Sequence, residues 1–185
     1  MSRLFFALDI SPQVKKQLAD WRSTQVDKPL INEPEKACHF KAIDENNFHI
    51  TLCFIGEVSA KQQLILIEKA SQLTQSLTPI NPQTLIINEV GLFKKPKIVY
   101  LSNKVTPPWL LKLATALSSS ASELALFQEN RPYLPHISLY RKASYLPSLT
   151  IQPNIKLTIE SFSLYQSISS TSGIKYQVIK SWNLT

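Results

Sequence analysis

The sequence predicts an α+β fold, a bilobal domain over residues 1–185. Its two halves are expected to be related by pseudo-twofold symmetry. Short alternating apolar segments interleave with three amphipathic stretches of helical spacing, which is typical of α+β chains. Two alternating segments, residues 49–56 and 136–141, share the order His, apolar, hydroxyl, Leu. They are separated by nearly half of the 185 residues. An internal duplication with one such strand in each half is the simplest interpretation.

The helices are predicted from apolar spacing and from residues that favour helix starts. Ser11 followed by Pro12 combines a hydroxyl cap with a proline in the first turn. Ser59 and Gln62 have the spacing of a capping box. The predicted helices cover residues 12–25, from 59 to about 76, and from the prolines at 107 and 108 to about 124.

The strands are predicted from alternating or continuous apolar residues bounded by turn signals. Besides the two His segments, the predicted strands cover residues 3–10, 38–42, 83–92, 97–103, 155–165 and 174–182. Residues 44–47 are expected to form a turn into the first His strand, and Gly56 is expected to end that strand. The basic segment 93–96 is predicted as a hairpin tip.

The composition indicates a globular protein with a polyanionic partner. The net charge is +7, and 44% of the residues are hydrophobic. Nucleic acid is the first candidate partner, and a basic surface without such a partner is the alternative. Lys and Arg are scattered and form no basic tail, which argues against nonspecific coating of DNA. A monomer is expected.

The chain shows no targeting or membrane signal. Asp9 follows a short apolar run, so residues 1–9 do not resemble a signal peptide. No apolar run approaches the ~20 residues that a membrane helix needs. Cys38 and Cys53 lack the spacing of a metal finger, and nothing indicates an oxidising compartment. We therefore expect a cytoplasmic protein that does not bind membranes.

The two His segments predict a phosphoryl-transfer site. Residues two apart on a strand share a face, so His49 is expected beside Thr51 and His136 beside Ser138. If the strands are neighbours, one neutral imidazole removes a proton from the nucleophile and the other, protonated, donates one to the leaving oxygen. The hydroxyls then donate to the non-bridging oxygens. Two structural histidines are the alternative, and the repeated hydroxyl argues against it. Acyl transfer is disfavoured because the chain has no G-x-S-x-G elbow.

Strict alternation also assigns the neighbouring side chains to faces. Phe54 is expected on the packed side of its strand. Tyr140 is expected on the face of His136, and Arg141 on the opposite face. Arg141 therefore reaches the cleft only if a bulge or a strand end redirects it.

A zinc site built from Cys38, His39, His49 and Cys53 is the main chemical alternative. His49 and Cys53 are four residues apart on one strand, roughly 13 Å along its axis. One tetrahedral ion cannot bridge that separation. We expect no metal and no other cofactor, with Cys53 as a small residue on the floor of the cleft and His39 at its rim.

The segments around both motifs resemble the two-histidine (2H) phosphoesterase superfamily. Within it, the chain is most similar to the bacterial RNA 2′,3′-cyclic phosphodiesterases, also called the 2′-5′ RNA ligase family. The resemblance covers nearly the whole chain and is carried by residues 3–8, 47–56, 131–141, 164–167, 176 and 182–185. Where members of the family often have Arg followed by an aromatic residue or proline, this chain has Cys38-His39-Phe40.

The resemblance implies a two-lobed α+β fold in which two antiparallel or mixed sheets, flanked by helices, surround a central cleft that contains the histidines. It also implies metal-free hydrolysis of RNA 2′,3′-cyclic phosphate ends to 2′-phosphomonoesters, with 2′-5′ joining of RNA ends as the reverse reaction. It implies that His49 and His136 are the catalytic pair. His136 would be the base toward water and His49 the acid toward the 3′-oxygen, although the motif itself is symmetric. Thr51, Ser138 and Arg141 would hold the phosphate.

The rim of the cleft is expected to contact bases and flanking phosphates. The candidates are Phe40, Phe93, Tyr133 and Tyr140 for stacking, and Lys94, Lys95 and Arg131 for phosphates. Two alternatives to the cyclic phosphodiesterase stay open. One is an RNA-binding module without turnover. The other is a phosphodiesterase of the same superfamily that acts on 2′-5′ oligonucleotides or on another cyclic nucleotide.

Overall fold

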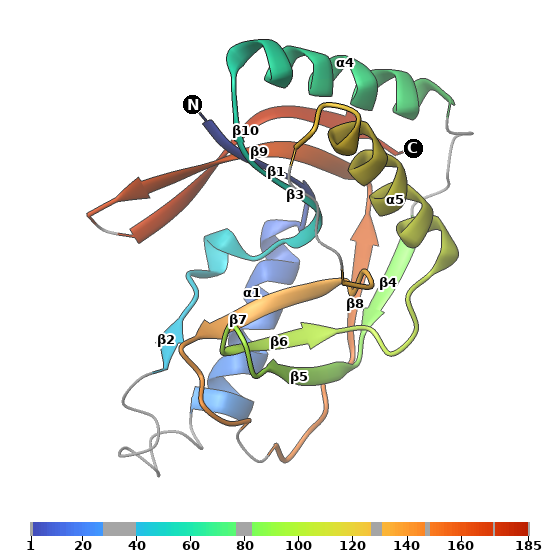
Figure 1. The fold of residues 1–185 in the computed structure, drawn as a ribbon. Helices are drawn as coiled ribbons and strands as arrows, with labels where there is room; N and C mark the ends of the chain where they lie inside the picture. Colours follow the sequence, from blue (N-terminus) through green and yellow to red (C-terminus); the bar gives the residue numbers. More distant parts are fainter. Residues whose placement is uncertain are drawn as a thin grey trace.

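Two four-stranded antiparallel sheets form two lobes, and a two-stranded sheet joins them (Figure 1). The computed structural model describes residues 2–27, 40–76, 83–126, 131–146, 149–171 and 173–184. Helices cover the sheets, and the strand of each predicted His segment lies in a different sheet. The predicted bilobal α+β fold is confirmed.

The first lobe contains the first His strand at the edge of its sheet. The strand order is β10-β9-β1-β3, with β1 at Ser2–Leu8, β3 at Ile50–Val58, β9 at Ser161–Ser170 and β10 at Gly173–Asn183. Two helices pack on this lobe: α4 (Ala60–Ser76) against β10 and α5 (Pro108–Ser122) against β3. The two helices also contact each other (Figure 1).

The second lobe contains the second His strand inside its sheet. The strand order is β2-β7-β6-β5, with β2 at Lys41–Ala42, β5 at Glu89–Phe93, β6 at Ile98–Ser102 and β7 at His136–Arg141. Helix α1 (Pro12–Arg22) packs behind β7 and continues into a wider π-helical turn, η1 (Ser23–Asp27). The helix from the first half of the chain thus supports the second His strand, while α5 from the second half supports the first.

The third sheet pairs β4 (Gln83–Ile87) with β8 (Ile155–Ile159) and corrects two predicted strands. The segments predicted as single strands over 83–92 and 155–165 are each divided between two sheets. Asn88 separates β4 from β5, and Glu160 separates β8 from β9. The apolar alternation continues on both sides of Asn88 and of Glu160, because each segment has buried or half-buried side chains in both of the sheets to which it contributes.

The predicted helix starts are confirmed. The Ser11 hydroxyl accepts a hydrogen bond from the Val14 N–H (3.4 Å). The Ser59 N–H donates to the Gln62 side chain (2.9 Å), and the Gln62 N–H donates to the Ser59 hydroxyl (3.3 Å), as a capping box requires. Within the described ranges, no helix combines the length and hydropathy that are needed to cross a bilayer.

Both His strands carry a bulge at the leucine that follows the hydroxyl residue. In β3, Leu52 has no partner between the pairs that Thr51 and Cys53 form with β1. In β7, Leu139 has no partner between the pairs that Ser138 and Tyr140 form with β6. The equivalent bulges extend the predicted pseudo-twofold symmetry beyond the sequence motif.

The first His strand continues past Gly56, which corrects its predicted end. Strand β3 runs to Val58, and a second irregularity lies opposite Leu4 and Phe5. Gly56 has a φ of +83°, a conformation that disfavours residues with a Cβ. The glycine therefore permits a bulge rather than ending the strand.

Candidate active site

Both cleft histidines are held by a backbone carbonyl two residues earlier. The Nδ1 atom of His49 lies 2.7 Å from the Asn47 carbonyl oxygen, and Nδ1 of His136 lies 2.9 Å from that of Leu134. A carbonyl only accepts hydrogen bonds, so Nδ1 carries the proton in both rings. Each neutral imidazole therefore presents Nε2 as its base, which is the same tautomer in both lobes.

A short helical turn positions the carbonyl that orients His49. The 3₁₀ turn η2 (Glu45–Asn47) occupies the segment predicted as a turn. Asp44 caps it by accepting a hydrogen bond from the Asn46 N–H at 2.8 Å. The Asn47 side chain donates to the carbonyl of Ile174 at 2.8 Å, which ties the turn to β10. The imidazole of His49 is thus oriented by η2 and β10, two elements that are distant in sequence.

The hydroxyl residues lie where alternation predicts them. The Thr51 hydroxyl is 3.1 Å from Nε2 of His49 and donates to it when the ring is neutral. Ser138 and Thr51 line the same cavity as His49. The structure therefore places both hydroxyls beside the first imidazole, on the face of the two strands that encloses the cleft.

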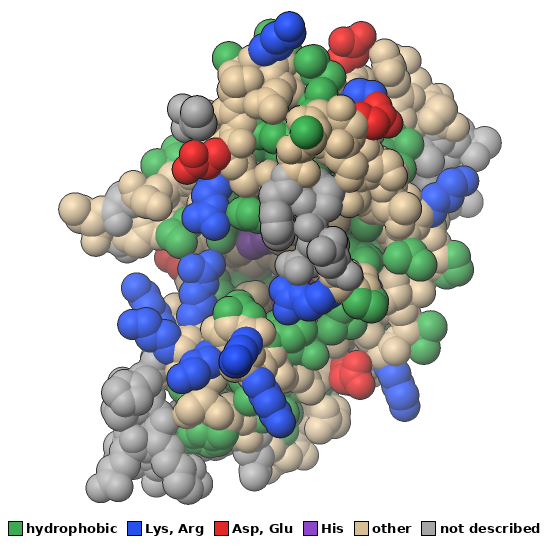
Figure 2. Space-filling model, in the orientation of Figure 1, with side chains coloured by type: hydrophobic (Ala, Val, Ile, Leu, Met, Phe, Trp, Pro, Cys, Tyr) green, Lys and Arg blue, Asp and Glu red, His purple; other side chains and the backbone are tan. Residues whose placement is uncertain are grey.

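The cleft consists of two adjoining cavities. The smaller one, about 240 Å³, is lined by His49, Ser138 and Arg141. The larger one, about 830 Å³, contains His136 in its wall. Thr51 lines both cavities, so they are neighbouring parts of one cleft. Figure 2 shows a histidine inside a hollow that Lys and Arg side chains surround. A small polar pocket thus opens beside a larger, mostly apolar one.

Aromatic rings wall off His49. Phe5 of β1 and Tyr176 of β10 each place a ring centroid 5.0 Å from the imidazole. Tyr165 of β9 stacks on Phe5 at 5.3 Å. Because these rings displace water, the imidazole is buried in a largely apolar wall.

His136 has an equivalent aromatic wall on the second sheet. Phe93 of β5 lies 5.0 Å from its ring and Tyr100 of β6 lies 5.6 Å away. The Phe93 and Tyr100 rings stack with their centroids 4.1 Å apart, and the Tyr100 ring lies directly against Gly91. A Cβ at position 91 would lie 2.3 Å from the Tyr100 ring, so only glycine permits this close approach.

Burial keeps both imidazoles neutral in the free protein. The pKa of His49 is lowered to about 4, and burial is the largest cause. The hydrogen bond to the Asn47 carbonyl opposes this effect, and positive charge on His136, Lys15 and Arg141 adds to it. Burial also lowers the pKa of His136, and Arg131 adds to that effect. An anion bound between these groups would favour the imidazolium form. The site is thus electrostatically prepared for a negatively charged ligand.

The bulge at Leu139 decides which residues of β7 face the cleft. Arg141 lines the smaller cavity. The bulge at Leu139 redirects it there, as the alternation in the sequence required for Arg141 to reach the cleft. The predicted orientation of Tyr140 is wrong: its side chain is only 3% exposed and packs behind the strand. One unpaired residue moves both side chains to the opposite faces.

The equivalent bulge in β3 overturns the prediction for Phe54. This side chain was expected on the packed side but is 36% exposed and lines both cavities. Phe54 follows Thr51 by three residues, just as Arg141 follows Ser138. The two side chains therefore occupy equivalent positions on the two His strands.

The predicted rim residues divide into two groups. Phe93, Tyr133 and Arg131 line the larger cavity. The Tyr133 hydroxyl donates to the Thr51 carbonyl at 3.1 Å, which links the approach to β7 with β3. Lys94 and Lys95 lie in the exposed turn between β5 and β6.

Phe40 does not have the predicted position. It packs against Tyr140 and Tyr145, with ring centroids 5.9 and 5.1 Å away, and lines neither cavity. Because Tyr140 is turned behind β7, the aromatic residues that pack on it are drawn away from the cleft as well.

Several residues that line the smaller cavity were missing from the predicted site, among them Arg3 and Tyr176. Arg3 of β1 lines it, with its guanidinium carbon 5.2 Å from the centre of the Phe54 ring. Tyr176 of β10 lines it from the other end of the chain. Both belong to segments that carried the family resemblance, but only the pairing of β1 and β9, and of β9 and β10, reveals that they share the cavity.

Of the four residues considered for the alternative zinc site, only His49 and Cys53 belong to the part of the chain that the structure describes. Cys38 and His39 lie outside the described residues, and no group of three or more potential metal ligands occurs within the described ranges. Cys53 is 6% exposed and lines the larger cavity, as expected for a small residue on the cleft floor.

Comparisons with known proteins agree with this geometry. The family model described as LigT like Phosphoesterase matches residues 8–100. The RNA 2′,3′-cyclic phosphodiesterase of Escherichia coli (strain K12) is 34% identical over 99% of this chain and 97% of its own length. That of Thermotoga maritima is 26% identical over 96% of this chain and 92% of its own. The crystal structure of E. coli LigT complexed with 3′-AMP superposes with a TM-score of 0.85 at 31% identity, covering 100% of this chain and 98% of that one. The chain belongs to the LigT-like phosphoesterases.

Proposed function

We propose that this protein is an RNA 2′,3′-cyclic phosphodiesterase that produces 2′-phosphomonoesters. The observation that carries the proposal is the matched pair of imidazoles. Each has its Nδ1–H bound to a backbone carbonyl and its Nε2 left for proton transfer, and one lies in each wall of a single cleft. Side chains of this chain can therefore perform both proton transfers of a phosphodiester hydrolysis.

The smaller cavity fits the cyclic phosphate. Arg141 and Arg3 bring positive charge to it, and the hydroxyls of Thr51 and Ser138 can donate to the two non-bridging oxygens. Donors aimed at these oxygens stabilise the additional charge that develops when the nucleophile attacks phosphorus. His49 borders the same cavity, so it lies within reach of a bridging oxygen of the phosphate.

The proton transfers follow from this placement. His136, neutral in the free protein, takes a proton from water as the water oxygen bonds to phosphorus. The bond from phosphorus to the 3′-oxygen breaks, and protonated His49 gives that oxygen its proton. The product keeps its phosphate on the 2′-oxygen. His49 must first be protonated, which the bound anion promotes by raising its pKa.

The larger cavity fits the terminal nucleoside and the chain that precedes it. Phe54, Phe93 and Tyr133 offer aromatic surface to a base, and Arg131 offers a cation to a flanking phosphate. All of these groups come from one chain, which supports a single-domain monomer as the active form. The relatives named above are RNA 2′,3′-cyclic phosphodiesterases, and a solved structure of E. coli LigT contains 3′-AMP.

The experiment is hydrolysis of 2′,3′-cyclic AMP and of an RNA with a 2′,3′-cyclic end, in EDTA, followed by ³¹P NMR. The expected product is the 2′-phosphomonoester. His49→Ala and His136→Ala should each reduce the rate by on the order of 10²–10⁴-fold while the circular dichroism spectrum stays unchanged. Turnover near that of the wild type in either variant would refute the paired mechanism. A 3′-phosphate product would show that the leaving oxygen is misassigned, and binding without hydrolysis would indicate an RNA-binding module.

The roles of the two histidines can be separated with an activated substrate. A 4-nitrophenyl phosphodiester has a leaving group that departs without a proton, so it needs the base but not the acid. His49→Ala should therefore lose much less activity on this substrate than on 2′,3′-cyclic AMP, whereas His136→Ala should lose activity on both. The opposite pattern would exchange the two roles.

A further inference from the structure

Arg22, the last residue of α1, contacts the residues that precede two groups of the site. Its guanidinium carbon lies 5.4 Å from the ring centre of Phe48 and 5.6 Å from that of Tyr140. Phe48 immediately precedes His49, and Tyr140 immediately precedes Arg141. The Arg22 guanidinium, behind the cleft, thus packs on Phe48 in the segment that leads into β3 and on Tyr140 within β7.

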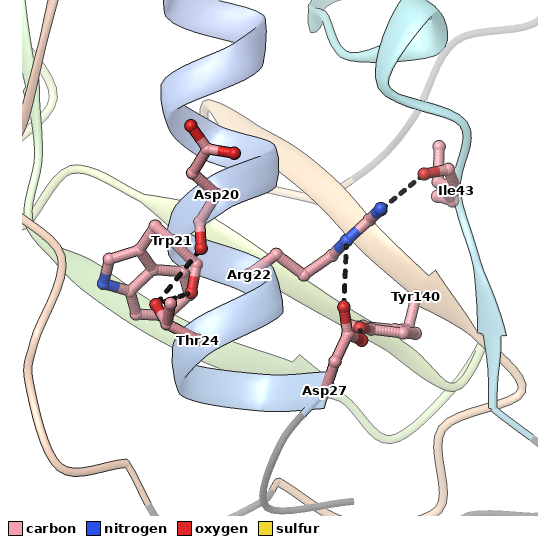
Figure 3. Close-up of polar contacts among 7 residues, drawn as sticks. All are labelled: Asp20, Trp21, Arg22, Thr24, Asp27, Ile43 and Tyr140. Atoms are coloured by element: carbon pink, nitrogen blue, oxygen red, sulfur yellow. Dashed lines mark hydrogen bonds and ion pairs between the residues drawn. The ribbon is translucent and has the colours of Figure 1, made fainter. Parts of the chain in front are cut away.

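Polar contacts fix this cation in place (Figure 3). Nη1 of Arg22 donates to the Ile43 carbonyl at 2.5 Å, and Nε lies 4.0 Å from the Asp27 carboxylate. The Tyr140 hydroxyl donates to the same carboxylate. The Arg22 side chain is only 15% exposed, whereas that of Asp27 is 39% exposed, so water screens the carboxylate more than the guanidinium.

The hydrogen bonds of Arg22 and Asp27 are connected to the bulge at Leu139. The N–H of Ile43 donates to the carbonyl of Leu139 at 2.9 Å, and Leu139 is the unpaired residue of β7. Arg22 therefore holds Ile43 through its carbonyl, and Ile43 holds the bulge through its N–H. Asp27 holds the next residue, Tyr140, through its hydroxyl.

The competing conformation is a regular strand. Without the bulge, alternation would turn Tyr140 toward the cleft and Arg141 away from it, because a slip of one residue exchanges the faces. Burying the Tyr140 hydroxyl against Asp27 favours the bulged form. The ion pair of Arg22 with Asp27, whose side chain is 39% exposed, contributes little to stability by itself, but it can favour one arrangement over another.

We propose that Arg22, Asp27 and Tyr140 are positioning residues that hold the bulge at Leu139 and thereby keep Arg141 directed at the phosphate. The inference rests on the proposed function only in that Arg141 is taken to bind the phosphate of the substrate. None of the three lines the smaller cavity, so they act on the substrate through the residues that they hold. Ile43 is one of these and lines that cavity, so the test must isolate the part of the effect that passes through Arg141.

The sharpest test compares two variants that each lack one hydroxyl group, where each hydroxyl donates a hydrogen bond to a residue of η1. Tyr140→Phe removes the donor to Asp27, and Thr150→Val removes the donor to Gln25, whose side chain the Thr150 hydroxyl meets at 2.6 Å. The probe is inorganic phosphate, titrated by calorimetry. Tyr140→Phe should weaken phosphate binding and raise the KM for 2′,3′-cyclic AMP about 3- to 10-fold, whereas Thr150→Val should leave both unchanged.

A double-mutant cycle with Arg141→Gln tests whether the effect passes through Arg141. Arg22→Met should weaken phosphate binding at least about 10-fold in the wild-type background and less than about twofold when Arg141 is already Gln. Unchanged phosphate affinity in Tyr140→Phe, equal losses in Tyr140→Phe and Thr150→Val, or additive losses in the cycle would each overturn the proposal. Should Arg22→Met fail to fold, the comparison of Tyr140→Phe with Thr150→Val decides alone.

Failure of the inference is distinguishable from failure of the proposed function. Phosphate titration needs no turnover, so it reports on Arg141 even if the substrate is misassigned. Hydrolysis by the wild type together with unchanged phosphate affinity in Tyr140→Phe would refute the positioning role and leave the function intact.

Discussion

The buried imidazole of His49 makes the stability of the free protein depend on pH. Burial lowers its pKa to about 4, with smaller effects from nearby positive charges. In the unfolded chain its pKa returns to about 6.5. The unfolded chain therefore binds the proton more readily than the folded protein. The stabilising contribution is complete above about pH 6.5 and is lost as the pH falls toward about 4.

The size of the effect follows from the two pKa values. Each pH unit between them is worth about 1.4 kcal/mol. Lowering the pH from 7.5 to 4.5 should therefore reduce the free energy of unfolding by about 2.5 kcal/mol through His49 alone. Urea unfolding of the wild type and of His49→Gln at both pH values measures it, because the variant lacks this titration. His136→Gln is the comparison variant: it keeps the titration of His49 and should therefore lose more stability between the two pH values than a variant that lacks both imidazoles, His49→Gln/His136→Gln.

Histidine NMR gives the direct check. The His49 ring should titrate near pH 4 in the free protein and at a higher pH once inorganic phosphate is bound, because an adjacent anion favours the imidazolium. The pKa of His49 should also rise in His136→Gln, which removes one of the positive charges that lower it. A His49 resonance that titrates near pH 6.5 without phosphate would refute the argument that burial holds the ring neutral.

Two further substitutions test the hydroxyl and the aromatic wall. Thr51→Ala should lower kcat by roughly 10²–10³-fold if the hydroxyl donates to developing charge, and steady-state kinetics with a wild-type unfolding curve as control measures it. An unchanged kcat would remove Thr51 from the mechanism. Gly91→Ala places a methyl group 2.3 Å from the Tyr100 ring and should destabilise the fold by about 1–3 kcal/mol. Urea unfolding checks this, and Tyr100→Leu in the same chain should restore much of the loss; a Gly91→Ala variant as stable as the wild type would contradict the close approach.

The motif residues were predictable because they obey a local rule. His49 immediately precedes β3 and lies two residues before Thr51, and His136 and Ser138 are two residues apart in β7. The bulges at Leu52 and Leu139 lie beyond both pairs. A strand places such residues on one face whatever its partners are. Their orientation toward the cleft therefore followed from the sequence without any knowledge of the sheet order.

The orientation of the residues just beyond each motif could not be predicted, because it depends on how each strand pairs with its neighbour. A bulge is a property of a strand pair, because one strand contributes an extra residue opposite its partner. Nothing in the order of Leu139, Tyr140 and Arg141 shows that β6 offers no partner to the first of them. The errors at Phe54 and Tyr140 thus have one cause, and they occur at equivalent positions.

Residues from the chain ends enter the site only through the sheet order. Arg3 and Tyr176 line one cavity because β9 pairs with both β1 and β10. Apolar patterning identifies each of these strands but does not tell which strands are neighbours. The division of the segments around Asn88 and Glu160 between two sheets escaped detection for the same reason.

The equivalent bulges also show where the pseudo-symmetry of the site ends. Three residues beyond the hydroxyl, β7 presents the cation Arg141 to the smaller cavity, while β3 presents the apolar ring of Phe54. Arg3 lies over that ring, so a second guanidinium enters from the neighbouring strand. Two equivalent imidazoles cannot act as acid and base unless their surroundings differ. Arg141 and Arg3 both line the cavity of His49, whereas the larger cavity beside His136 is lined by Phe54. In the proposed mechanism, this difference in surroundings makes His49 the acid and His136 the base.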